Sequence, residues 1–283
     1  MGGSAFSRIR GMVLVVALAA GLTAAVPSTA SAAAPTATSD PAAAAAAEAA
    51  ANAAALTPCH PTAVHPFPVV LVHGTFGSAS DWGSVAAGMR AAGYCVYALD
   101  YGNHGTGPIA QSAQQLATFV DGVLTVTGAG RVEFVGHSQG GMMPRYYIRF
   151  LGGAAHTAGL IGMAPSNHGT INPLVDVAGL VCTACDEQEA GSAFLTRLNA
   201  GHDVEPGVGY TVISTRFDEV VLPFRSQFLA GPASQVTNVT VQARCPFDFS
   251  GHVGIRTDPV ALQWVMSGLA RGGVADPALR PAC

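Results

Sequence analysis

The chain has 283 residues and a formal net charge of -4, and each of its 13 basic residues is arginine. The absence of lysine excludes Schiff-base and pyridoxal chemistry and the lysine of a phosphate-binding loop, because each needs a primary amine at a fixed place. Charged residues make up only 11% of the chain, which leaves no basic stripe for nucleic acid. The composition is that of an apolar globular protein.

The N-terminal segment has the three parts of a secretory signal peptide. Arg8 and Arg10 form a basic region, residues 12–26 are apolar, and small residues at 30–32 supply a cleavage site. The alternative is a membrane anchor, but that needs about 20 apolar residues and this run is shorter. We therefore expect residues 1–32 to be removed, leaving a secreted, extracellular protein without a transmembrane segment.

Two further parts follow the signal segment. Residues 33–57 are rich in Ala, Pro and Thr, and a composition without an apolar face predicts a spacer or pro-segment that packs against nothing. Residues 58–283 have the length of one globular domain and contain no internal repeat.

All six cysteines lie beyond the signal segment, at Cys59, Cys95, Cys182, Cys185, Cys245 and Cys283. An even count in a secreted chain favours three disulfides, and we expect sequential pairing. Cys182 and Cys185 form a C-x-x-C, a spacing also found in zinc sites and redox centres. Since a zinc site would need a second ligand pair nearby and the sequence has none there, we favour a structural disulfide.

Short, continuously apolar runs predict six strands, at residues 68–73, 94–100, 132–136, 160–164, 210–215 and 236–243. Continuous rather than alternating hydrophobicity indicates a sheet covered on both faces. Helical spacing predicts a helix over 109–126, and Asp258-Pro259 provides an N-cap and first-turn proline for a helix through Leu269. Alternating strands and helices predict an α/β fold with a mostly parallel central sheet, whose site lies beyond the carboxyl ends of the strands.

The motif that carries chemistry is G-x-S-x-G at residues 136–140, directly after a predicted strand and before a helical stretch at 142–150. The flanking glycines allow a tight turn that exposes the hydroxyl of Ser138, and the following helix N-terminus favours developing negative charge. This context predicts that Ser138 is a nucleophile. The competing interpretation is a glycine-rich turn with an ordinary serine.

A serine nucleophile on this architecture takes its partners in the chain order Ser, acid, His. Only His252 lies in the loop after the final predicted strand, so we expect it to be the base. Asp218 follows the carboxyl end of the strand 210–215 and is the expected acid, with its neighbour Glu219 as the alternative. The competing interpretations are a loop histidine that binds backbone and a solvated turn carboxylate.

Acyl transfer also needs two hydrogen-bond donors for the oxyanion of the tetrahedral intermediate. The backbone N–H of Gln139 is one candidate, because it follows the nucleophile. Thr75, in the loop after the first strand, is the other, through its N–H and also its hydroxyl; Phe76 is the competing donor. We expect His73 and His137 to be structural, because each adjoins a turn.

Four segments together resemble a known family: H-G-T at 73–75, G-H-S-Q-G-G at 136–141, S-T-R-F-D-E-V-V at 214–221 and S-G-H at 250–252. They resemble secreted bacterial lipases of the class 2 lipase family in the α/β-hydrolase superfamily, over about residues 66–270. The resemblance implies an α/β-hydrolase fold, with Ser138 as nucleophile, Asp218 as acid, His252 as base, and Thr75 with Gln139 as oxyanion donors. It also implies an ester hydrolase acting on acylglycerols without a metal or cofactor.

Residues 170–209 contain no clear strand and are too many for a simple connection, which predicts a cap or lid. Four apolar residues in this stretch either line an acyl pocket or meet an oil surface, or else form ordinary core under a loop held by a disulfide: Val175, Val177, Leu180 and Val181. The sequence leaves both interpretations open.

The expected function is that of a secreted, monomeric serine ester hydrolase, foremost a triacylglycerol lipase that meets lipid or another ester at an oil–water interface. The alternatives are a short-chain carboxylesterase, a polyester hydrolase, or another serine acyltransferase or thioesterase. A non-catalytic binding protein on this fold is disfavoured, because Ser138, Asp218 and His252 are all present.

Overall fold

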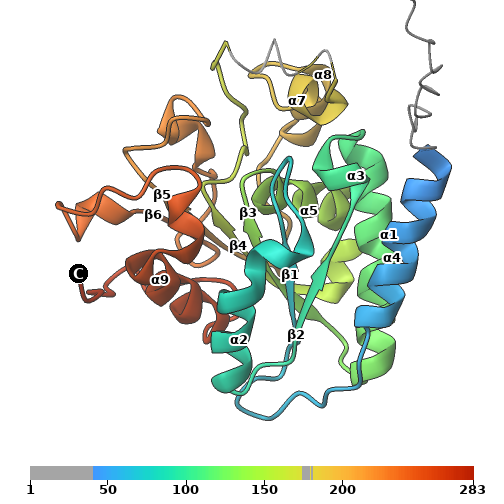
Figure 1. The fold of residues 1–283 in the computed structure, drawn as a ribbon. Helices are drawn as coiled ribbons and strands as arrows, with labels where there is room; N and C mark the ends of the chain where they lie inside the picture. The colour runs from blue at the N-terminus through green and yellow to red at the C-terminus, as the bar shows by residue number, and fades with distance from the viewer. Residues whose placement is uncertain (1–40, 174–178, 180) are drawn as a thin grey trace, which may run out of the picture. The chain divides into compact units, whose positions relative to one another are not determined.

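The computed structural model describes residues 41–173, 179 and 181–283, so the signal segment and Val175, Val177 and Leu180 lie outside the described residues. Six strands form one sheet in the order β2-β1-β3-β4-β5-β6 (Figure 1), and every neighbouring pair is parallel. The predicted strands are confirmed as β1 (Val69–Val72), β2 (Val96–Leu99), β3 (Val132–His137), β4 (Thr157–Met163), β5 (Gly209–Ser214) and β6 (Val236–Thr240).

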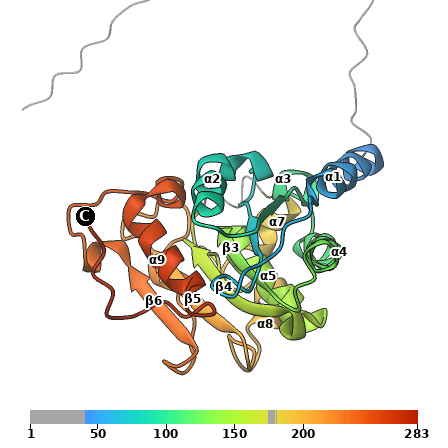
Figure 2. The same ribbon diagram turned by 90° about the horizontal axis from the view of Figure 1, so that it is seen from below.

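Helices cover both faces of the sheet (Figure 2). One face packs against α4 (Ile109–Thr127) and α5 (Gln139–Phe150), and the other against α2 (Gly83–Ala91) and α9 (Pro259–Leu269). Asp258 caps α9 as predicted, since its carboxylate accepts the N–H of Ala261 at 2.7 Å. The α/β fold class is therefore confirmed.

Shorter elements connect these layers and were not predicted from periodicity, because each is too short to show any. The α-helices are α3 (Gly102–Gly105), α7 (Thr183–Glu187) and α8 (Ala193–Leu198). The 3-10 turns are η1 (Ala79–Trp82), η2 (Gly153–His156), η3 (Phe224–Gln227), η4 (Val241–Ala243) and η5 (Gly254–Thr257). None of the helices among the described residues combines the length and the apolar character needed to cross a bilayer.

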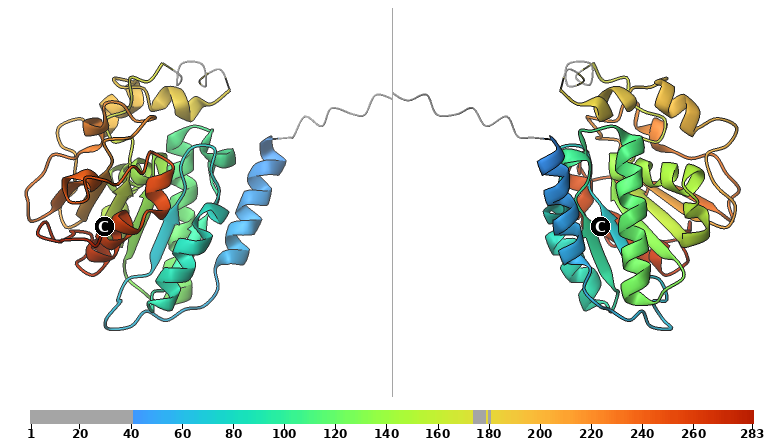
Figure 3. Two further views of the ribbon diagram at one scale, coloured as in Figure 1. Left: turned by 60° about the vertical axis from the view of Figure 1, so that its left-hand side comes forward. Right: turned by 90° about the vertical axis from the view of Figure 1, so that its right-hand side faces the viewer.

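The expected spacer differs from the structure, because its second half forms the helix α1 (Pro41–Ala55), which lies beside α4 and β2 (Figure 3). Every fourth residue is half-buried, namely Ala44, Glu48, Asn52 and, directly after the helix, Leu56. The residues between them are exposed. The side chain of Asn52 makes two hydrogen bonds to the backbone of Asp100, at 2.8 and 2.9 Å, and Leu56 packs over Gly122. Because the alanine side chains are short, the helix lies close to its neighbours, and the longer side chains of Asn52 and Leu56 hold it there.

Three disulfides join the cysteines in the expected sequential order, as Cys59–Cys95, Cys182–Cys185 and Cys245–Cys283. The first ties the segment after α1 to the residue before β2, and the last ties the C-terminus to the turn after β6. The middle bridge closes the start of α7, so the C-x-x-C is a disulfide and not a zinc site.

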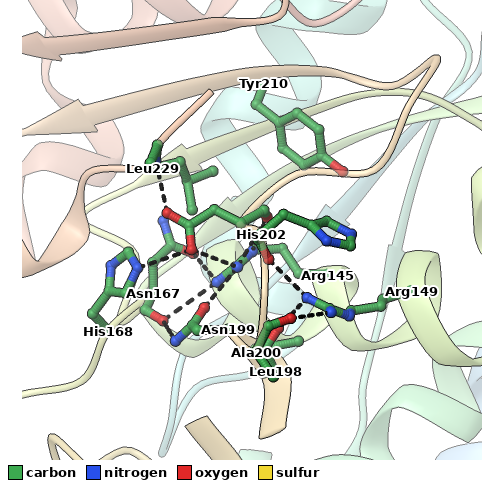
Figure 4. Close-up of polar contacts among 12 residues, drawn as sticks. Arg145, Arg149, Asn167, His168, Leu198, Asn199, Ala200, His202, Tyr210 and Leu229 are labelled. Atoms are coloured by element: carbon green, nitrogen blue, oxygen red, sulfur yellow. Dashed lines mark hydrogen bonds and ion pairs between the residues drawn. The ribbon is translucent and has the colours of Figure 1, made fainter. Parts of the chain in front are cut away.

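Two arginines of α5 fix this helix to the chain at 198–203 (Figure 4). Arg145 is buried and donates to the Asn199 side chain at 2.7 Å and the Asp203 carbonyl at 2.9 Å. Burial lowers the pKa of Arg145 to about 10, which still leaves it charged at neutral pH beside the Asp203 carboxylate, 3.8 Å away. Arg149 donates to the carbonyls of Leu198 and His202 at 2.8 and 2.7 Å.

We expect Arg145→Met to lower the free energy of unfolding by about 3 to 5 kcal/mol, because it leaves buried acceptors and a carboxylate without their partner. Urea unfolding at pH 7 measures this. Arg280→Met is the matched control at an exposed arginine, and we expect it to change the free energy by less than about 0.5 kcal/mol. A loss under about 1 kcal/mol in Arg145→Met would show that the network contributes little.

Glu133 is an acidic residue in the middle of the sheet, on β3. The residue is 1% exposed, and its Oε1 has no hydrogen-bond partner in the part of the chain that is described. Burial raises the pKa of Glu133 from 4.5 to about 8, so between these pH values the folded state binds more protons than the unfolded state. The free energy of unfolding must then fall as pH rises through this window.

Glu133→Gln removes this titration. We expect the free energy of unfolding of the variant, minus that of the wild type, to rise by a few kcal/mol between pH 4.5 and pH 8. Urea titrations at several pH values measure the difference, and a difference that does not change with pH would contradict the buried, neutral carboxyl.

Candidate active site

Ser138 lies in the turn between β3 and α5, with φ +54° and ψ -123°. The turn depends on the two motif glycines. A Cβ on Gly136 would lie 1.8 Å from the carbonyl oxygen of Gly140, and one on Gly140 would lie 2.1 Å from that of Val72. The left-handed φ of Ser138 is a strained conformation for a residue with a side chain. This is the sharp strand-to-helix turn expected from the motif, and Ser138 lines the pocket in front of it.

His252 and Asp218 are buried and paired, with 2.9 Å between His252 Nδ1 and Asp218 Oδ2. The other carboxylate oxygen accepts the N–H groups of Val220 and Val221 at 2.9 and 2.7 Å, and Gln227 donates to Oδ2 at 2.8 Å. Burial alone would raise the pKa of Asp218, but these hydrogen bonds, led by that from His252, hold it below its usual value. An ionised Asp218 makes Nδ1 the protonated ring nitrogen and leaves Nε2 free to accept a proton.

Glu219, the alternative acid, binds the backbone of His252 and not its ring, since its carboxylate accepts the His252 N–H at 2.9 Å. On the other side, His137 Nε2 lies 2.7 Å from the His252 carbonyl oxygen. Burial lowers the pKa of His137 to about 3, so its ring is neutral and donates from Nε2. The backbone of His252 is therefore held from both sides.

Ser138 and His252 line one pocket of about 610 Å³, and Asp218 lies behind His252. Among the described residues, no hydrogen bond joins Ser138 Oγ to His252 Nε2. Such bonds are often long in an enzyme without substrate and tighten when substrate binds. The expected cap segment also contributes to the pocket wall, through Thr170, Asn172, Cys185 and Gln188.

The two expected oxyanion residues are joined through their side chains, because Thr75 Oγ1 donates to Gln139 Oε1 at 2.6 Å. The hydroxyl proton of Thr75 is thus engaged. By contrast, neither backbone N–H of the pair has an acceptor within the described ranges. His73 lies behind this loop, where its ring stacks on Tyr101 with 4.2 Å between centroids.

Two side chains at this site were not found from the sequence. Gln188, just after α7, donates to both Thr75 and Gln139, at 3.0 and 3.2 Å, and Gln227 donates to Asp218. Neither lies in a motif, and each reaches the site from a separate segment. No local signal in the sequence marks them.

The expected cap is only partly described. Val181 is 82% exposed and is therefore not part of the core. The structure places α7 and α8 in this stretch, with the Cys182–Cys185 bridge at the start of α7.

Two solved lipases have the same fold. Lipase B of Aspergillus fumigatus superposes with a TM-score of 0.66 at 20% identity, covering 75% of this chain and 54% of that protein. The mature form of the Bacillus licheniformis lipase BlEst2 superposes with a TM-score of 0.57 at 18% identity, covering 75% of this chain and 95% of the other. At these identities the likeness shows the α/β-hydrolase fold alone.

Two relatives found by sequence similarity are also lipases. A triacylglycerol lipase of Pseudarthrobacter phenanthrenivorans is 35% identical over 93 residues, covering 28% of this chain and 27% of that protein. One of Burkholderia plantarii is 34% identical over 93 residues, covering 28% and 24%. The chain thus spans about a quarter of the length of the curated relatives it matches.

The sequence profile of the family Lipase (class 2) matches residues 66–265, well over half of the chain. The chain belongs to the class 2 lipase family.

Proposed function

We propose that this protein is a secreted serine carboxylic ester hydrolase, and specifically a triacylglycerol lipase. The observation that carries the proposal is the pocket itself, which is lined both by a serine on a strained turn and by a histidine already paired with a buried carboxylate. Two backbone N–H groups beside that serine have no acceptor among the described residues. Family membership supports the same chemistry, and three disulfides suit an oxidising, extracellular location.

In the proposed mechanism, His252 Nε2 takes the proton of Ser138 as Oγ attacks the ester carbonyl. Asp218 keeps the ring oriented and stabilises the positive charge that develops on it. The N–H groups of Thr75 and Gln139 bind the oxyanion, and each such donor contributes about 3 to 4 kcal/mol. His252 then protonates the departing alcohol, and water hydrolyses the acyl-enzyme by the same route.

Exposed apolar side chains lie at and beside the pocket, and they favour a substrate that presents an apolar surface. Phe247 and Phe249, on the loop that carries His252, are 88% and 70% exposed, and Phe249 contacts Phe217 beside Asp218. Phe76 and Val253 are also exposed and line the pocket. A cluster of this kind beside a pocket is typical of an interaction site. We propose that these loops meet aggregated lipid; a short-chain esterase or a polyester hydrolase is the alternative.

The first test is Ser138→Ala. We expect hydrolysis of p-nitrophenyl butyrate to fall by at least about 10⁴-fold, and a fluorophosphonate probe to label the wild type on the peptide containing Ser138 but not to label the variant. Ser234→Ala, at an exposed serine, is the matched control and should keep full activity. Equal labelling of the wild type and Ser138→Ala would place the nucleophile elsewhere, and an inactive, unlabelled wild type would refute the ester-hydrolase proposal.

The second test separates lipase from esterase with Phe247→Ser combined with Phe249→Ser. If the loops meet lipid, hydrolysis of emulsified triolein should fall about 10-fold or more, because each phenylalanine contributes roughly 1.5 to 3 kcal/mol on transfer from water. Hydrolysis of dissolved p-nitrophenyl butyrate should change less than about twofold. The control Val64→Ser removes a similarly exposed apolar side chain that precedes the amino end of β1, whereas the pocket is lined by residues that follow its carboxyl end. An unchanged rate on triolein would favour the esterase alternative.

A further inference from the structure

We propose that Gln188, in the cap segment, is a positioning residue of the oxyanion hole. It holds the side chains of Thr75 and Gln139 so that their backbone N–H groups face the substrate carbonyl. The inference rests on the proposed ester hydrolysis and adds a residue that lies outside the motifs of the chain.

The amide of Gln188 is buried and makes hydrogen bonds from both ends. One N–H of Nε2 donates to the Ala184 carbonyl at 2.9 Å. The other is shared between Thr75 Oγ1 at 3.0 Å and Gln139 Oε1 at 3.2 Å. Oε1 accepts the hydroxyl of Ser166 at 2.7 Å. One side chain thus joins the cap, the loop after β1, the start of α5 and the loop after β4.

These partners determine which way the amide points. The carbonyl of Ala184 can only accept, so the atom facing it must be the NH₂ group of Gln188. Because this NH₂ group can only donate, the atom of Gln139 that faces it must be the amide oxygen Oε1. The single proton of the Thr75 hydroxyl goes to that oxygen, while its lone pair accepts from Gln188. The three side chains form a closed ring of hydrogen bonds in which each contacts the other two.

The two halves of the oxyanion hole differ in how firmly the backbone holds them. Gln139 begins a helix whose approach to β1 is fixed by the close packing of Gly140 on Val72. Thr75 lies in a loop, next to the exposed Phe76 with φ +61°, and its side chain is held by the ring. We infer that Gln188 acts mainly by placing the N–H of Thr75.

Gln188 is itself fixed within the cap. Its N–H donates to the Ala184 carbonyl at 3.1 Å, and its carbonyl accepts the N–H of Thr170 at 3.0 Å. The Cys182–Cys185 bridge closes the turn of chain just before it. The oxyanion hole is therefore completed by the cap segment as well as by the two loops of the hydrolase core.

The test is Gln188→Leu, which keeps a side chain of similar size and removes the amide. With p-nitrophenyl butyrate we expect kcat to fall about 10- to 100-fold, while KM changes less than about threefold, since the donors act in the transition state. The inhibition constant of butylboronic acid should rise by the same factor as kcat/KM falls. The reason is that Ser138 Oγ bonds to boron and gives a tetrahedral adduct with an oxygen in the oxyanion hole. Gln114→Leu, at an exposed glutamine of α4, should leave all three quantities unchanged.

Thr75→Val provides a second route if Gln188→Leu folds poorly, because it breaks the same ring and keeps the backbone N–H. The losses in Thr75→Val and Gln188→Leu should be non-additive in the double variant, as for residues of one network. An unchanged kcat in Gln188→Leu, a rise in KM alone, or losses that simply multiply would overturn the positioning role while the wild type stays an active esterase. A wild type inactive on every ester would overturn the proposed function itself, and this inference with it.

Discussion

The rest of the site depends on the close approach of three backbone segments at the turn after β3. Two glycines without side chains let α5 lie directly on the ends of β3 and β1. This contact forces Ser138 into a left-handed conformation and turns its hydroxyl to the pocket. It also presents the first N–H of α5 beside that hydroxyl, where a helix has no internal acceptor to offer. The proposed nucleophile and one of the two proposed oxyanion donors thus both follow from one packing constraint.

The second constraint is electrostatic and concerns the buried pair of Asp218 and His252. Asp218 lies beyond the end of β5 and stays ionised because four hydrogen-bond donors surround its carboxylate. Glu219 and a neutral His137 hold the backbone of His252 by its N–H and its carbonyl. The loop that carries the histidine is therefore fixed independently of the ring, which leaves Nε2 available for proton transfer in the proposed mechanism.

Much of this architecture follows from the sequence, because parallel strands have a continuous apolar pattern and their carboxyl ends meet at one edge. Chain order along that edge was enough to select Ser138, Asp218 and His252, which lie together as expected although their catalytic roles remain proposals. The hydrogen bonds that Glu219 and Gln188 make at this site were not predictable, because they join segments distant in the chain. The helix α1 was missed for a related reason, since an alanine-rich stretch has no apolar periodicity and is held by Asn52 and Leu56.

The most direct measurement is a crystal structure of the protein after reaction with diethyl p-nitrophenyl phosphate. The proposed mechanism predicts a covalent bond between phosphorus and Ser138 Oγ, with one phosphoryl oxygen about 2.7 to 3.1 Å from the backbone nitrogens of Thr75 and Gln139. His252 Nε2 should lie within hydrogen-bond reach of the Ser138 oxygen. Phosphorus on another residue, or a phosphoryl oxygen turned away from both nitrogens, would contradict the proposed nucleophile and oxyanion donors.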